Sequence, residues 1–222
     1  MNHPGQEIKG ATMEKIDFKK SQKEIYTAPK GDFAEIVLPR MSYLMIDGAG
    51  DPNTAPAYAE ALGWLYPVSF AMKFAARAEL GRDYVVPPLE GLWWAEDPAD
   101  FVARAKHRWH WTLMIRVPDF VTEGIFAAAV DKARSTRGTP PASLRRATLD
   151  EGLCLQTLHI GSYDDEGPTL ARLHDVEMPA RGLTFNGPHH EIYLSDPRRT
   201  APERLRTILR QPVRPHAARL AS

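Results

Sequence analysis

The feature that most constrains the fold is a pattern that occurs twice along the chain. The segments MIDGAGDPNTAPAYAEALGWL and TLHIGSYDDEGPTLARLHDV each read as a strand, a glycine, an acidic turn, a proline and then a helix. Such a repeat indicates a duplicated β-α-β-β unit. The similarity is low, so chance is the alternative. A true duplication predicts two units related by a pseudo-twofold axis, with antiparallel sheets around a central ligand cleft.

The remaining patterns extend this α+β interpretation over both halves. Alternating residues predict strands over 33–40, 41–50, 84–94, 108–117, 153–163 and within 181–196. Helical spacing predicts helices over about 55–80, 121–134, 164–176 and 201–210, the first with a kink or break at Pro67. We predict a flexible lead-in over 1–30 and one domain over 31–216, with halves of about 31–135 and 145–216.

Charge and hydropathy exclude several classes of protein. Lys plus Arg and Asp plus Glu both number 28, so the net charge is zero. A nucleic-acid partner favours a basic excess, and so does an anionic membrane surface, so neither partner is expected. No apolar run approaches the ~20 residues that span a bilayer, and the first 20 residues lack the apolar core of a signal peptide. We therefore expect a cytoplasmic protein.

Metal and cofactor motifs are missing from the sequence. The eight His residues show no metal-binding spacing, and there is no glycine-rich dinucleotide or phosphate loop. We expect neither a metal nor a cofactor. The single cysteine, Cys154, lies in an apolar strand-like run, which favours a buried hydrophobic role over the alternative of a catalytic thiol.

Aromatic residues are concentrated in the first half. All five Trp lie between positions 64 and 111, namely Trp64, Trp93, Trp94, Trp109 and Trp111. Strand parity places Trp93 and Trp94 on opposite faces. These rings either fill the core or form a box of flat surfaces for an aromatic or cationic ligand. Tyr43 and Tyr66 lie nearby in sequence and join Trp93, Trp94 and Trp111 as ligand-binding candidates.

Glu191 is the most informative single residue. It lies in HHEIYLSD on the same predicted strand face as Tyr193, so it faces either water or a cleft. In an apolar cleft its charged form is disfavoured, which suits a general base near neutral pH. Glu166 is either an acid at a helix start or a second carboxylate that shares a water with Glu191. We take Glu191, Glu166 and Tyr193 as catalytic candidates.

Several of these segments together resemble the GyrI-like small-molecule-binding family. The resemblance rests on YLMIDGAGDPN, LYPVSFAMKF, EGLWW, LHIGSYDDEGPT and HHEIYLSDPRRTAPERLRTILRQPV, and spans roughly residues 33–215. It implies duplicated β-α-β-β units around a ligand cleft, with a strand glutamate that matches Glu191. The chain is most similar to the stand-alone branch, because about 30 residues before the first predicted strand are too few for a DNA-binding module.

The resemblance also implies a function. Some stand-alone members hydrolyse the cyclopropane ring of DNA-alkylating cyclopropanoid natural products within an aromatic cage. The cage candidates here are Trp93, Trp94, Trp111, Tyr66 and Tyr193. The implied function is binding of bulky aromatic or electrophilic molecules, with hydrolysis that protects the cell. The alternative is a non-catalytic protein that sequesters or senses such a molecule.

Overall fold

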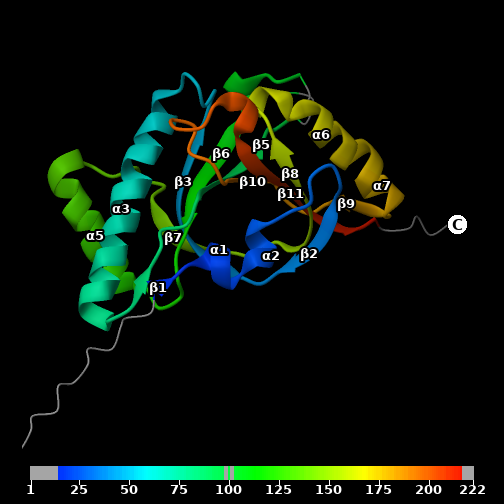
Figure 1. Ribbon diagram of the computed structural model, residues 1–222. Helices are drawn as coiled ribbons and strands as arrows, with labels where there is room; N and C mark the ends of the chain where they lie inside the picture. The colour runs from blue at the N-terminus through cyan, green and yellow to red at the C-terminus, as the bar shows by residue number, and fades with distance from the viewer. Residues whose placement is uncertain (1–14, 98–99, 101–102, 217–222) are drawn as a thin grey trace, which may run out of the picture.

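One curved antiparallel sheet organises the chain (Figure 1). The computed structural model describes residues 15–97, 100 and 103–216. Within them the strand order is β2-β8-β11-β10-β5-β6-β3-β7, and β9 pairs with the far end of β11. The strands are β2 (Ala34–Leu38), β3 (Met41–Ala49), β5 (Leu89–Trp94), β6 (His110–Arg116), β7 (Arg145–Leu149), β8 (Gly152–Ile160), β9 (Leu183–Phe185), β10 (His189–Tyr193) and β11 (Arg206–Pro215).

The strand order is symmetric about the β5–β10 pair, which confirms the duplicated fold. Outward from this pair run β5-β6-β3-β7 on one side and β10-β11-β8-β2 on the other. β3 and β8 have nine residues each and follow strands of five residues, β2 and β7. A glycine with positive φ follows both long strands, Gly50 and Gly161. The pseudo-twofold axis therefore passes between β5 and β10.

Two short links make the sheet curl. β2 and β3 lie far apart in the strand order, yet only residues 39–40 join them, and only residues 150–151 join β7 to β8. Three peptide units span at most about 11 Å, so the two edges of the sheet must approach each other. Side chains from both edges and from the middle form one buried cluster, which includes Leu38, Met41, Met114, Cys154 and Ile192. This inner face is the inside of the curl.

The outer face carries two separate helical layers. α3 (Pro56–Leu80) and α5 (Glu123–Arg137) pack on the first half. α6 (Gly167–Arg172), the π-turn η3 (Leu173–Glu177) and α7 (Met178–Ala180) pack on the second half. The two layers flank the sheet in Figure 1 and bury distinct clusters of apolar side chains. A curled sheet spreads such layers apart, and this leaves space above its central strands.

The last predicted helix is wrong. Residues 206–215 form the strand β11, preceded by the one-turn 3₁₀ helix η4 (Pro202–Arg204). β11 lies between β8 and β10, and its residues from Thr207 to Val213 are buried on both faces. Such burial on both faces hides the two-residue period of a strand. Backbone pairing with two neighbours then overrides the helical preference of the local sequence.

The prediction of a flexible lead-in is wrong for residues 15–30. They form β1 (Lys15–Ile16), α1 (Phe18–Ser21) and α2 (Lys23–Tyr26), and β1 pairs with β4 (Asp83–Tyr84). Ile25 and Tyr26 are buried in the inner cluster. The buried Arg210 side chain donates to the carbonyl of Ile25, at 2.6 Å. Buried polar groups need such partners, so the segment is part of the fold. The predicted lead-in over 1–14 lies outside the described residues.

The other predicted helices differ in detail. α3 continues through Pro67 without the predicted break, because its buried face, including Leu65, Val68 and Met72, packs on the sheet and on α5. Its first turn starts at Pro56, where a missing backbone N–H costs nothing. The predicted helix 164–176 is instead a 3₁₀ turn η2 (Tyr163–Asp165), α6 and η3. Within the described residues, no helix has the length and apolarity that a membrane crossing requires.

Candidate functional site

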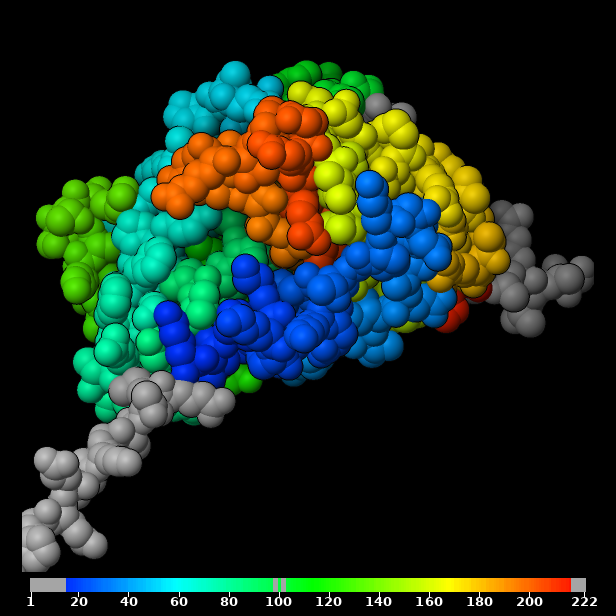
Figure 2. Space-filling model, viewed as in Figure 1, coloured from blue at the N-terminus to red at the C-terminus, as the bar shows by residue number. Residues whose placement is uncertain are grey.

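A cleft of about 1280 Å³ lies between the two helical layers, above the central strands. β5 and β10 form its floor, α3 one wall and α6 the other, and residues 86–88 and 195–202 lie at its rim. Figure 2 shows the surface hollowed between α3, the orange segment after β10 and the blue N-terminal segment. Lys19 of α1 also lines the cleft. Because β5 and β10 form the floor, the cleft lies at the pseudo-twofold axis, where the duplication predicts it.

Glu191 and Tyr193 lie on the floor of this cleft and are directly bonded. The Tyr193 hydroxyl donates to Glu191 Oε2 at 2.7 Å, and Trp93 Nε1 donates to the Tyr193 oxygen at 3.0 Å. Glu191 faces Gly91 across the β5–β10 pair. A Cβ at Gly91 would lie 2.9 Å from Trp93 Nε1 and 3.2 Å from the Tyr193 oxygen. Glycine at position 91 therefore leaves the space that this three-residue hydrogen-bond chain occupies.

Glu166 completes the group as a second buried carboxyl. It stands at the N-terminus of α6, is 4% exposed, and is hydrogen-bonded to the side chain of Glu191. Burial raises the pKa of Glu191 to about 7, although the bonds from Tyr193 and Glu166 favour its ionised form. Burial and the charge of Glu191 raise the pKa of Glu166 well above its usual range. Near neutral pH, Glu166 therefore keeps its proton and donates a hydrogen bond to the Glu191 carboxylate.

Aromatic rings surround the carboxyl pair. Tyr58 of α3 stacks on Trp93 with ring centroids 6.3 Å apart, and Trp109 meets Trp93 edge-on at 5.9 Å. The Tyr163 ring meets Tyr193 edge-on at 5.6 Å. All five rings line the cleft. Flat rings at these separations give an apolar wall with well-defined geometry, which suits a flat ligand.

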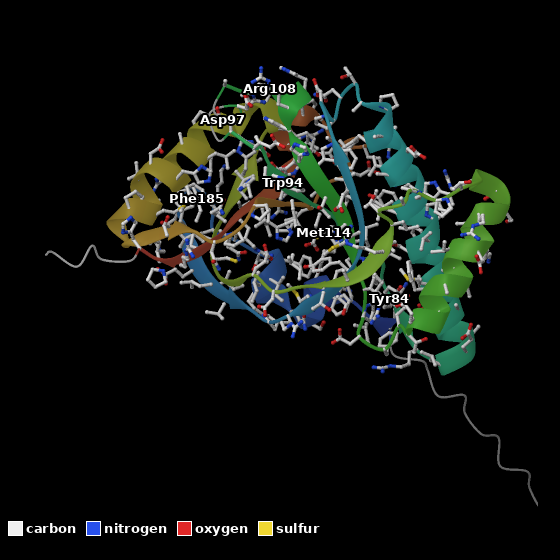
Figure 3. The ribbon with its side chains drawn as sticks, turned by 180° about the vertical axis from the view of Figure 1, so that it is seen from behind. Tyr84, Trp94, Asp97, Arg108, Met114 and Phe185 are labelled. Atoms are coloured by element: carbon white, nitrogen blue, oxygen red, sulfur yellow. The ribbon has the colours of Figure 1, made fainter. Side chains whose placement is uncertain are left out.

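Three predicted ligand-binding residues do not line the cleft, so these predictions are wrong. Tyr43 is fully buried in the inner cluster, on the opposite face of the sheet. Trp94, labelled in Figure 3, also packs on that face. Its ring stacks on His110, with the ring centroids 5.8 Å apart. Trp111 is on the outer face but is fully buried beneath Tyr58, whose ring it meets at 5.3 Å. A Cβ at Gly48 would collide with the Trp111 ring, which shows how tightly this ring is enclosed.

The other sequence candidates do meet in the cleft. Glu191, Glu166, Tyr193, Trp93 and Tyr66 all line it, from four different elements or loops. Parity correctly separated Trp93 from Trp94, and Trp93 donates a hydrogen bond to Tyr193, another of the cage candidates. Cys154 is buried, and burial raises the pKa of its thiol to about 12, which excludes a thiolate nucleophile at neutral pH.

Sequence reasoning missed Tyr58, Tyr163 and Arg104, which also line the cleft, and it named Trp109 only as one of the five clustered Trp. Tyr58 had a usable signal, because Tyr58, Leu62 and Tyr66 recur every four residues and share a helix face. Arg104 has none: it adopts a positive φ of 52° and reaches across to the carbonyl and the carboxylate of Asp164, at 3.0 and 2.7 Å. This clamp fixes the turn that carries Tyr163 and Glu166.

A known family of domains matches nearly the whole chain. The model of the GyrI-like small molecule binding domain matches residues 31–214. The chain belongs to this family. The match covers both helical layers and all strands from β2 to β10, together with nearly all of β11.

Solved structures agree in fold. An uncharacterized conserved protein from Listeria innocua is 40% identical, with a TM-score of 0.82, over 90% of this chain and 100% of the other. A protein from the same organism that is described as a hydrolase is 38% identical, with a TM-score of 0.77 and the same coverage. The C-terminal domain of EcmrR is 11% identical, with a TM-score of 0.54 over 83% of this chain and 98% of that domain, and is similar in fold alone. No curated protein matches the chain significantly.

Proposed function

We propose that the protein is a hydrolase of bulky, electrophilic aromatic molecules. In this proposal a buried carboxyl pair activates a water molecule, and the water attacks the bound substrate. The observation that carries the proposal is the hydrogen-bonded pair of Glu191 and Glu166 on the floor of an aromatic cleft. The pKa of Glu191 is raised to about 7, so this carboxyl gains and loses a proton near neutral pH, whereas Glu166 keeps its proton. Ligand binding alone does not call for such a pair, because a buried charge costs free energy.

The substrate class that we propose is an activated cyclopropane, as in the DNA-alkylating cyclopropanoids. Glu191 takes a proton from water while the water oxygen forms a C–O bond to a ring carbon. The ring C–C bond breaks, and its electron pair passes to the acceptor group conjugated with the ring. A proton from Glu166 or from solvent neutralises the product. The net reaction adds one water, and it inactivates the alkylating group and so protects the cell.

The neighbours of the pair have defined roles in this mechanism. Tyr193 donates to Glu191 Oε2 and so holds this carboxylate in the orientation in which it takes the proton of the water. Trp93 holds the Tyr193 oxygen in place. The rings of Tyr58, Trp93 and Trp109 keep the substrate flat and exclude bulk water, which strengthens electrostatic interactions inside the cleft.

Two observations support the hydrolase over a protein that only sequesters its ligand. Structural neighbours from Listeria innocua at 38 and 39% identity are described as hydrolases. The carboxyl pair is the second observation. A regulator that binds DNA specifically is not proposed, because the net charge is zero. We expect the protein to act in the cytoplasm on a small molecule, without a metal or a cofactor.

The test is turnover by Glu191→Gln. We expect the wild-type protein to convert a cyclopropanoid into a product heavier by one water, in excess over protein. General-base assistance contributes about 10²- to 10⁴-fold, so kcat of Glu191→Gln should fall by that factor. Its Kd, from Trp fluorescence, should change less than about threefold, because shape and stacking are preserved.

Asp175→Asn is the matched control, because Asp175 is an exposed carboxylate that lines the same cleft away from the β10 floor. Its kcat should equal that of the wild type. Full turnover by Glu191→Gln would refute the mechanism. Tight binding with no turnover by the wild-type protein would favour sequestration instead.

A further inference from the structure

A second buried charge cluster lies directly behind Glu191, on the inner face of the sheet. His190 Nδ1 lies 2.9 Å from Glu151 Oε1, and His190 Nε2 lies 2.9 Å from Glu90 Oε2. The three residues are 0, 6 and 1% exposed, in the order His190, Glu151, Glu90. We call this arrangement the carboxylate–imidazole bridge. It takes no part in lining the cleft.

The geometry of the bridge requires a charged imidazole. A neutral ring donates from only one nitrogen, whereas both nitrogens of His190 face carboxylate oxygens. An imidazolium donates to both carboxylates at once. Burial disfavours this charged form, but Glu151 and Glu90 more than offset burial and raise the pKa of His190 to about 8. At neutral pH the bridge therefore holds a positive charge between two negative ones.

Charged and titratable groups from the surrounding elements face the bridge, among them the Cys154 thiol of β8, whose pKa the charge of Glu151 raises further. Arg210 Nη1 of β11 lies 4.0 Å from Glu151 Oε2, and the Tyr26 hydroxyl of α2 lies 3.4 Å from Glu90 Oε1. Arg116 of β6 and Tyr43 of β3 interact electrostatically with Tyr26 in the same interior. With His190 charged, the cations of this group outnumber its carboxylates by one. This cluster places a net positive charge behind the negatively charged floor of the cleft.

The bridge also ties the two halves together at the catalytic position. Glu90 belongs to β5 and His190 to β10, the two strands that meet at the pseudo-twofold axis. The backbone pair next to them is Gly91 with Glu191. Glu151 joins β7 to β8, so it anchors β10 to the start of the second half. Strand alternation puts His190 and Glu191 on opposite faces of the same short strand.

We propose that His190, held in the carboxylate–imidazole bridge, is a positioning residue for Glu191. It fixes β10 against β5 behind the carboxyl pair, and its charge favours the ionised Glu191 that acts as the base. The inference rests on the proposed role of Glu191. Consistent with it, the charge of His190 is among the influences that hold down the pKa of Glu191.

The experiment measures the Glu191 carboxyl by ¹³C NMR on the full chain, with Glu191→Gln to assign the signal. In His190→Gln the apparent pKa of Glu191 should rise by about one unit. That is the effect of one charge at roughly 10 Å in a medium of dielectric constant near 20. The control His110→Gln removes a ring that stacks on Trp94 on the same inner face, and it should leave the pKa unchanged.

The charge of the His190 ring can also be measured directly in the wild-type protein. ¹⁵N NMR of the wild-type His190 ring should show an imidazolium at pH 7, and this needs no variant to fold. A neutral ring at pH 7 would overturn the proposal, as would a well-folded His190→Gln in which the pKa of Glu191 has not moved. A His190→Gln that is only less stable, with an unmoved pKa, would show a structural role.

The NMR readout is independent of turnover. If the wild-type protein fails to hydrolyse a cyclopropanoid while the pKa of Glu191 still rises in His190→Gln, the proposed function fails and the electrostatic coupling stands. If turnover is observed, the midpoint of the rise of kcat/KM with pH should move upward in His190→Gln by the same amount as the NMR value. At a pH well above both values, kcat should recover towards that of the wild type.

Discussion

The two halves share one strand plan but supply different chemistry to the cleft. Ala55 and Glu166 occupy the same position, the residue before the helix that follows Gly50 or Gly161. Across the axis, Gly91 lies opposite Glu191. The second half thus carries a glutamate at both positions where the first half has alanine or glycine. The asymmetry shows that the duplicated fold provides the cleft, and that single side chains decide what it does.

The aromatic residues that line the cleft come mainly from the first half, whereas the carboxyl pair comes from the second. The first half supplies Tyr58, Tyr66, Trp93 and Trp109, whereas the second supplies Tyr163 and Tyr193. The 25-residue helix α3 presents its tyrosines in a row, whereas the helical layer of the second half is short and interrupted by a π-turn. We therefore expect changes in the first half to alter binding and changes to the carboxyls of the second half to alter catalysis.

After the Glu191→Gln test, the largest further effect should come from Glu166→Gln. We expect kcat to fall about 10- to 100-fold, because the amide still donates a hydrogen bond to Glu191 but supplies no proton. The Kd for a flat ligand should stay within about threefold. Steady-state kinetics and fluorescence titration measure the two quantities. A loss equal to that of Glu191→Gln would show that the assignment of base and acid is incomplete.

A smaller effect, and one of a different kind, should follow from Tyr58→Ala in the first half. The change removes a ring that stacks on Trp93 and meets Trp111 edge-on. Loss of one aromatic contact is worth about 0.5–1.5 kcal/mol beyond area burial, so Kd should rise roughly tenfold. We expect kcat at saturating substrate to change less than about threefold. If kcat falls more than binding weakens, the division between the halves is wrong.

A last effect concerns the stability of the fold and leaves the function of the cleft aside. The pKa of Glu191 in the folded protein, about 7, lies above its ordinary value of 4.5. The folded state therefore binds the proton more tightly, and this stabilisation is full below pH 4.5 and lost as the pH rises through 7. Relative to Glu191→Gln, the wild-type protein should lose about 1–3 kcal/mol of unfolding free energy between pH 5 and pH 8. Urea unfolding at both values measures the difference, and a pH-independent difference would contradict the raised pKa.

Local patterns predicted much of the fold because the strands and turns that carry them are local features. The positions of Gly50 and Gly161, the proline at the start of α3 and the alternation through β10 were readable in the chain. The same alternation placed Glu191 and Tyr193 together on one face. The strand β11 was missed because it is buried on both faces, which removes the two-residue period that identifies a strand.

The sequence by itself determined which side chains share a strand face and where the long helix α3 begins, and it indicated that the plan repeats, because backbone geometry sets such local features within a few residues. Only the tertiary structure decided which face became the cleft. Tyr43 and Trp94 are aromatic like Trp93, yet the curl of the sheet places them inside it. The pairing of Glu166 with Glu191 likewise depends on the approach of α6 to β10. Such contacts join residues distant in sequence, and no local period encodes them.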